Sequence, residues 1–142
     1  MRYLLLLTAL LSFQSVNALD FDEIKALADQ GEDYAQHAVG VMYENGDGVP
    51  ENDAEAVKWY RKAADQGLAN AQYNLGIMYF NGDGVPENHV RAYVWLSMAK
   101  TQGYERAKKG VETVKNLMNK QQIAQGQALA TKCYESDYKD CD

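Results

Sequence analysis

Apolar residues in the middle of this chain recur at the spacing of amphipathic helices. In the segment AEAVKWYRKAADQG they fall at i, i+3, i+4, i+7 and i+8, which are Ala56, Trp59, Tyr60, Ala63 and Ala64. This periodicity predicts a helix with one buried face. Asp53 is the candidate N-cap of this helix, and Gly67 is the candidate residue that ends it.

The pattern returns further along the chain. The equivalent helix starts at Asn88 or His89, ends at Gly103, and uses Ala92, Trp95, Leu96 and Ala99. A different helix precedes each copy, with apolar and glycine positions at Ala35, Val39, Gly40 and Tyr43 and then at Ala71, Leu75, Gly76 and Tyr79. Glycine inside a helix costs about 1 kcal/mol relative to alanine, so its recurrence predicts that two helices approach closely there.

These copies make the chain a repeat protein. Gly31, Gly67 and Gly103 are spaced by 36 residues, and the two stretches that they bound share about half their positions. A period of 20 to 50 residues is typical of a solenoid, whose stacked units leave an extended surface for a partner. Trp59 and Trp95 hold the same place in each copy, which favours packing between units as their role.

The sequence NGDGVPEN joins the two helices of each copy, at 45–52 and 81–88. Its Asn-Gly and Asp-Gly pairs and its proline predict the turn of a helical hairpin. A calcium loop is the alternative, because polar oxygens alternate at Asn45, Asp47, Glu51 and Asp53. Pro50 and Ala56 replace the glycine and the closing glutamate that such a loop needs, which favours the plain turn.

Two segments carry a family resemblance: AQHAVGVMYENGDGVPENDAEAVKWYRKAADQG and AQYNLGIMYFNGDGVPENHVRAYVWLSMAKTQG. Their order of Ala, Gly, Tyr, the glycine turn, Trp and closing Gly resembles the Sel-1-like repeat, a relative of the tetratricopeptide repeat. The resemblance implies an all-α protein, an α/α right-handed solenoid with a tetratricopeptide-like superhelix and helical caps. We expect a single domain over 19–142, with an N-terminal cap helix (19–30), two repeats (31–66 and 67–102), and a degenerate third unit with a C-terminal cap (103–142). The segment NKQQIAQGQALATKC predicts a final helix from about Gln121 to Lys132, with Asn119 three positions before Gln122 as the start of a capping box.

The N-terminus has the pattern of a secretory signal. Arg2 precedes an apolar run from Leu4 to Leu11, and a polar stretch then ends at Ala18. We interpret 1–18 as a signal peptide that is removed, which predicts a periplasmic or secreted protein without membrane insertion after processing. A retained membrane helix is the alternative, but it needs about 20 apolar residues and polar residues interrupt this run.

Cys133 and Cys141 are the two cysteines of the chain. In an oxidising compartment a pair this close in sequence predicts a disulfide bond that holds the C-terminal tail. A thioredoxin-like redox motif would have two intervening residues, and this pair has seven.

Charge and motif content narrow the possible functions. The formal net charge is −6, which disfavours nucleic acid as a partner. Arg106, Lys108 and Lys109 form a small basic cluster that either meets an acidic partner or is a solvated helix face. The two histidines, His37 and His89, are far apart and have no cysteine at metal-ligand spacing, and no catalytic triad or phosphate loop stands out. We therefore expect no enzyme activity, no metal and no cofactor.

A partner surface is expected on the first helix of each pair, which lines the concave groove in the related tetratricopeptide architecture. The candidate partner-binding residues are Tyr73, Asn74, Ile77 and Phe80 in the second repeat and His37, Val41 and Glu44 in the first. The second copy is more apolar, and aromatic side chains are frequent binding anchors. The alternative is that Tyr73 and Phe80 pack in the core.

These observations favour an exported protein–protein interaction module or adaptor that binds a protein or peptide. Two repeats offer a short groove, which suits a small peptide or a homodimer. The family resemblance suggests envelope signalling, host interaction or neutralisation of an effector, although a shared fold does not determine function. The alternative is an enzyme or binder that acts on β-lactams or cell-wall peptides, as is known for cysteine-rich relatives. Their pattern places a disulfide in each repeat, whereas these repeats contain no cysteine.

Overall fold

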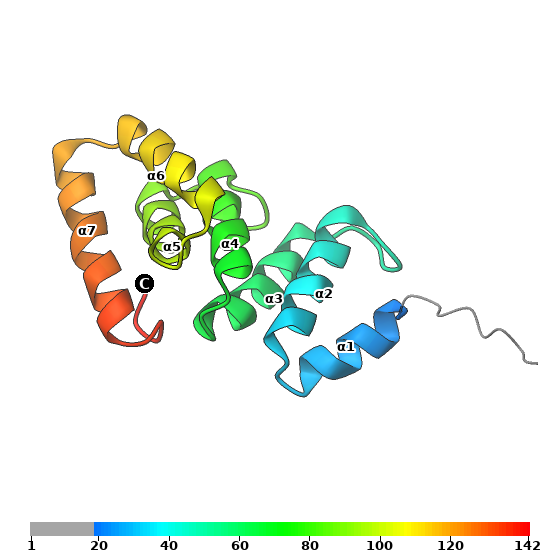
Figure 1. Ribbon diagram of the computed structural model, residues 1–142. Helices are drawn as coiled ribbons and strands as arrows, with labels where there is room; N and C mark the ends of the chain where they lie inside the picture. Colours follow the sequence, from blue (N-terminus) through cyan, green and yellow to red (C-terminus); the bar gives the residue numbers. More distant parts are fainter. Residues whose placement is uncertain (1–18) are drawn as a thin grey trace, which may run out of the picture.

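The computed structural model describes residues 19–142, so the proposed signal peptide lies outside the described residues. Within that range the chain is all-helical, and it runs through α1 (Phe21–Asp29), α2 (Asp33–Asn45), α3 (Asp53–Asp65), α4 (Ala69–Asn81), α5 (His89–Thr101), α6 (Glu105–Leu117) and α7 (Lys120–Glu135). Figure 1 shows the helices following one another across the molecule, with α1 and α7 at opposite ends. The predicted α solenoid is therefore confirmed.

Asparagine side chains begin the second helix of each repeat. The Asn52 side chain accepts a hydrogen bond from the Glu55 backbone N–H (3.1 Å), and Asn88 does the same for Arg91 (3.0 Å). Asn52 rather than the expected Asp53 is the N-cap, because its extended backbone turns its side chain onto the first turn of α3. At the C-terminal end of α3, Gly67 follows with a positive φ of +90°, as a helix-ending glycine should.

The final helix is longer than expected. The sequence predicted a helix from Gln121 to Lys132, and α7 runs from Lys120 to Glu135. Its start has the predicted capping box: Asn119 accepts from the Gln122 backbone N–H, and Gln122 accepts from the Asn119 backbone N–H. The additional residues at the C-terminal end place Cys133 within α7, where it forms a disulfide bond with Cys141 of the tail.

The recurring helix glycines mark where the two helices of each hairpin meet. A Cβ added at Gly40 would lie 2.6 Å from the Tyr60 ring, and one at Gly76 would lie 2.7 Å from Leu96 Cγ. Neither space can hold a methyl group, so the predicted close approach is present in both hairpins.

Paired glutamines join successive repeats. Gln102 Nε2 donates to Gln72 Oε1 (2.7 Å) and to the Gly67 carbonyl (2.8 Å), while Gln72 Nε2 donates to the Ala64 carbonyl (3.2 Å). The corresponding residues one unit earlier make the same bonds, and they are Gln66, Gln36, Gly31 and Ala28. Gln72 is fully buried, and these bonds satisfy an amide that would otherwise be costly to bury. We call each set an amide clasp.

The C-terminal tail folds back onto the solenoid. A disulfide joins Cys133 to Cys141, as predicted, and both residues are buried. The Asp142 carboxylate then pairs with Arg61 on α3 and, at 3.7 Å, with Arg91 on α5. Figure 1 shows the C-terminus turned back from α7 toward α5. The tail thus connects the terminal helix to the second helices of both repeats.

Reduction of this disulfide should destabilise the protein by about 2–3 kcal/mol, because it restores freedom to a short loop in the unfolded chain. Urea unfolding followed by circular dichroism, with and without a reductant, measures this loss. A variant carrying Cys133→Ala and Cys141→Ala is the control and should not respond to the reductant. An unchanged unfolding midpoint for the reduced native protein would contradict the expectation.

Candidate functional site

A pocket opens between the first helices of the last two helical pairs. It has a volume of about 260 Å³ and is lined by α4 residues Tyr73, Ile77 and Phe80, by Leu96 of α5, and by α6 residues Arg106, Lys109, Gly110, Thr113 and Val114. Three of the candidate groove residues therefore lie together in one hollow. The same three pack against the hydrophobic core, so Tyr73 and Phe80 are half-buried and also reach the pocket.

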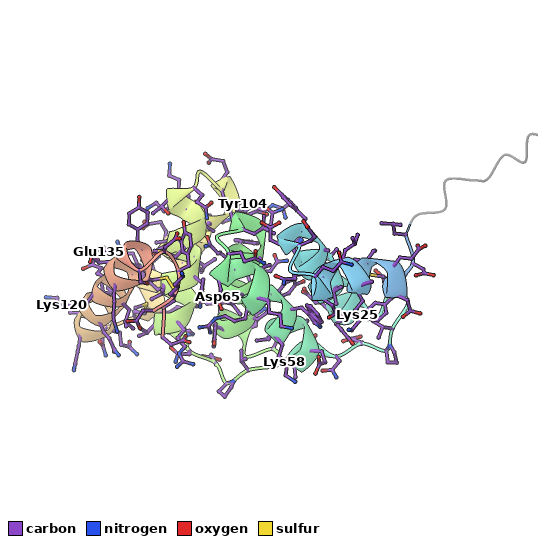
Figure 2. All side chains as sticks on the ribbon, turned by 90° about the horizontal axis from the view of Figure 1, so that it is seen from below. Lys25, Lys58, Asp65, Tyr104, Lys120 and Glu135 are labelled. Atoms are coloured by element: carbon purple, nitrogen blue, oxygen red, sulfur yellow. A yellow bond between two sulfur atoms is a disulfide. The ribbon has the colours of Figure 1, made fainter. Side chains whose placement is uncertain are left out.

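Neighbouring rings hold the aromatic wall in place. The Tyr73 ring packs against Tyr104 with centroids 5.1 Å apart, and Tyr104 is labelled in Figure 2. Phe80 stacks on the His89 ring at 5.6 Å. Contacts of this kind limit the rotamers of both side chains, so the wall is formed before any ligand arrives.

The opposite wall carries positive charge. Arg106 and Lys109 are exposed residues of α6 that line the pocket, and they are three residues apart, so they share one face of the helix. Neither joins any ion pair formed within residues 19–142. The Thr113 hydroxyl, also on this side, donates to the Lys109 carbonyl (3.0 Å). The pocket is therefore apolar at its base and cationic along one side.

The other candidate residues lie in the preceding gap, between α2 and α4. His37 Nε2 is 3.1 Å from Asn74 Nδ2, and the His37 ring lies 5.6 Å from the Tyr60 ring. The Tyr60 hydroxyl donates to the Glu44 carboxylate. Burial, with the Glu44 carboxylate beside it, raises the pKa of Tyr60 well above its ordinary value. These polar groups are satisfied by one another, which leaves them less available to a ligand.

Two exchanges between the copies leave smaller side chains in the later gap. Leu96 stands where Tyr60 stands one repeat earlier, and Gly110 stands 36 positions after Asn74. The side chain of Leu96 is smaller than the phenol of Tyr60. Gly110 has no side chain where the earlier copy has the amide of Asn74. A Cβ added at Gly110 would lie 3.2 Å from the Leu96 methyl groups, so even an alanine would begin to fill the space.

Sequence reasoning therefore assembled only part of this site. It placed Tyr73, Ile77 and Phe80 together, but it assigned Asn74, His37 and Glu44 to the same surface, and the structure gives them internal bonds in the earlier gap. Val41 is half-buried and packs against the core. The contributions of Leu96 and Gly110 were missed, and aligning α6 with α4 position by position would have identified the missing side chain.

The burial of His37 gives stability a pH dependence. Desolvation lowers the pKa of His37, so the unfolded chain binds a proton at a higher pH than the folded protein does. Stability should therefore fall as the pH drops below about 6.5, the ordinary histidine pKa, and the fall should stop below the folded pKa. Thermal unfolding between pH 5 and 8 tests this. The His37→Gln variant should show a smaller slope in that range, and an equal slope would contradict the assignment.

Two further features bear on the class of site. Within residues 19–142, no group of three or more His, Cys, Asp or Glu side chains is placed to hold a metal ion. No helix in the described range is long and apolar enough to cross a membrane.

Stacked hairpins with a 36-residue period define an α-solenoid repeat protein. The Sel1 repeat family matches residues 33–68 and 69–104, about half of the chain. The chain belongs to the Sel1 repeat family, whose repeats are generally protein–protein interaction modules. Each family unit starts two residues after the repeats counted from Gly31 and Gly67, and so begins with the first helix.

Among the solved structures that are similar to this chain are the following two. A protective antigen present in uropathogenic Escherichia coli strains, described as having an SLR fold, is 28% identical with a TM-score of 0.79, over 83% of this chain and 26% of its own. A Sel1 repeat protein from Oxalobacter formigenes is 28% identical with a TM-score of 0.66, over 86% of this chain and 58% of its own. This chain thus spans less than two thirds of either protein. A search of curated proteins finds no match.

Proposed function

We propose that this chain is an exported protein-interaction module that holds a segment of a partner protein in the groove between α4 and α6. The observation that carries the proposal is the preformed pocket, in which half-buried aromatic side chains meet exposed cations. Buried aromatic and arginine side chains are the residue types that most often dominate the energy of a protein interface. The interaction role of Sel1 repeats in general supports the same conclusion.

The chemistry of the lining supports binding rather than hydrolysis. The side chains that line the pocket include no carboxylate and no imidazole, the groups that most often activate a hydroxyl such as that of Thr113. This argues against the alternative of an enzyme acting on β-lactams or cell-wall peptides. Within the residues that the structure describes, the groove has the composition of a docking site.

Export is the second part of the proposal. The signal-like pattern of 1–18 and the disulfide between Cys133 and Cys141 both suit an oxidising compartment, the periplasm or the exterior. Envelope signalling, host interaction and effector neutralisation are the processes that we would examine first. The mass of the protein recovered from outside the cytoplasm tests export: cleavage after Ala18 should leave residues 19–142, less two hydrogens for the disulfide.

Capture from an envelope extract of the source organism tests the groove. The bait is the exported protein, and the test variant carries Tyr73→Ala and Phe80→Ala. A matched control carries Tyr34→Ala and Tyr134→Ala, which remove two exposed aromatic rings away from the pocket. All three proteins should first give the same helical circular dichroism spectrum. A partner held by the native protein and the control, but lost by the test variant, supports the groove, whereas equal capture by all three would refute it.

A further inference from the structure

The charge of the pocket is one-sided. Arg106 and Lys109 project from α6, while the facing helix α4 has the sequence ANAQYNLGIMYFN and carries no charged residue at all. No acidic side chain lines the pocket to neutralise these cations. A ligand in the pocket would therefore meet two positive groups beside an apolar surface. A carboxylate is the complementary group, because it can accept charge-assisted hydrogen bonds from both.

The size of the pocket limits what enters it. Sites for drug-sized molecules have volumes of about 300–1,000 Å³. At about 260 Å³, this pocket lies just below that range and suits one large side chain with its adjoining main chain. Its base is made of Ile77, Leu96 and Val114, so an apolar side chain is the best fit.

The earlier gap provides an internal comparison. Asn70 and Tyr73 occupy the positions there that Arg106 and Lys109 occupy in the later gap. Both are uncharged, and in that gap Tyr60 is hydrogen-bonded to Glu44 and Asn74 to His37. The later gap thus combines smaller side chains, at Leu96 and Gly110, with two added positive charges.

We propose, building on the function proposed above, that the groove selects a peptide segment in which a carboxylate lies next to a large apolar side chain. The apolar side chain occupies the pocket between Tyr73, Phe80 and Gly110, and the carboxylate pairs with Arg106 and Lys109. The carboxylate is the side chain of an adjacent Asp or Glu in that segment. A C-terminal carboxylate would present the same chemistry to α6, and it is the second source that the peptides below test.

Four fluorescein-labelled peptides distinguish these sources. One has Phe between Asp and Glu in a Gly-Ser chain with an amidated end, and the second ends in Phe with a free carboxylate and has no acidic side chain. The third replaces the acids of the first by Asn and Gln, and the fourth replaces them by Lys. Fluorescence anisotropy with the exported protein should show the first peptide binding roughly three- to ten-fold more tightly than the third, because exposed ion pairs contribute modestly. The second peptide should bind no more tightly than the first. The fourth should bind most weakly.

Three variants locate the interaction. Arg106→Gln with Lys109→Gln should abolish the preference for the acidic peptide and leave the affinity for the neutral peptide nearly unchanged. Lys108→Gln is the matched control, since it removes an exposed charge from the same helix outside the pocket. Gly110→Asn copies the earlier gap and should weaken binding of the acidic and neutral peptides alike.

Four results would overturn the proposal: tighter binding of the second peptide than of the first, equal affinity for acidic and neutral peptides, loss of the preference in Lys108→Gln as complete as in the double variant, or no binding by any peptide. In each case the proposed function is judged separately, because capture that depends on Tyr73 and Phe80 would still support a groove of different selectivity.

Discussion

Replacing Gly84 by Ala is expected to lower the free energy of unfolding by about 3–5 kcal/mol, with contributions from the left-handed backbone and from a steric clash. Gly84 has a φ of +69°. Its added Cβ would lie 2.4 Å from the Asp53 carbonyl carbon and 2.7 Å from the Ala54 nitrogen. These atoms belong to the backbone at the start of α3, so the clash cannot be relieved by turning a side chain.

Gly48 is the matched control for this substitution. It holds the equivalent position in the first NGDG loop and has nearly the same φ, +72°, but the nearest described atom to its added Cβ is 3.4 Å away. Gly48→Ala should therefore cost only about 1–2 kcal/mol, the backbone contribution. Urea unfolding monitored by far-ultraviolet circular dichroism compares the two variants. Equal losses would show that the second loop moves away from α3 without cost.

Trp95→Ala is the second substitution with a large expected effect, a loss of about 3–5 kcal/mol. Trp95 is fully buried in the main hydrophobic cluster, so its removal leaves a large cavity. The Arg61 guanidinium lies over the Trp95 ring at 5.1 Å and also pairs with Asp142. Loss of the indole ring therefore also removes a contact that positions Arg61, whose guanidinium pairs with Asp142 in the C-terminal tail.

Trp59→Ala provides the comparison for Trp95. Trp59 holds the same place one repeat earlier, but it is 5% exposed and belongs to a smaller cluster with Ala28 and Val39. Lys62 lies over its ring at 4.0 Å, on the solvent side of the helix. We expect a smaller loss for Trp59→Ala than for Trp95→Ala, measured by the same urea titration. The reverse order would mean that the N-terminal end of the solenoid limits its stability.

The fold could be predicted from the sequence because each helix and turn pattern occurs twice, once in each repeat. Gly40 and Gly76 occupy the same register, which made a helix contact a better explanation than chance, and the structure shows that contact in both hairpins. The role of a single residue, such as the N-cap of α3, was harder to predict. Asp53 and Asn52 are both good capping residues, and only the backbone geometry decides that Asn52 takes that role.

The candidate site was harder to predict, because it depends on differences between the copies rather than on their similarity. Tyr73 and Phe80 were recognisable as aromatic side chains on a first helix. The hollow beside them comes from Gly110, in a helix whose sequence has lost most of the repeat pattern. A missing side chain has no periodicity of its own, so a hydrophobic pattern cannot reveal it. Knowledge of which helices face one another is needed as well.

The amide clasps have a consequence for how such a protein can grow. Because Gln72 and Gln102 make the same bonds as Gln36 and Gln66, the junction between units is interchangeable and independent of what lines each gap. Duplication of one 36-residue unit would add a compatible junction and a new gap together. A few substitutions on the first helices could then give each gap a different binding preference. A longer array would bind a longer peptide segment, with one side chain of the ligand in the gap of each unit.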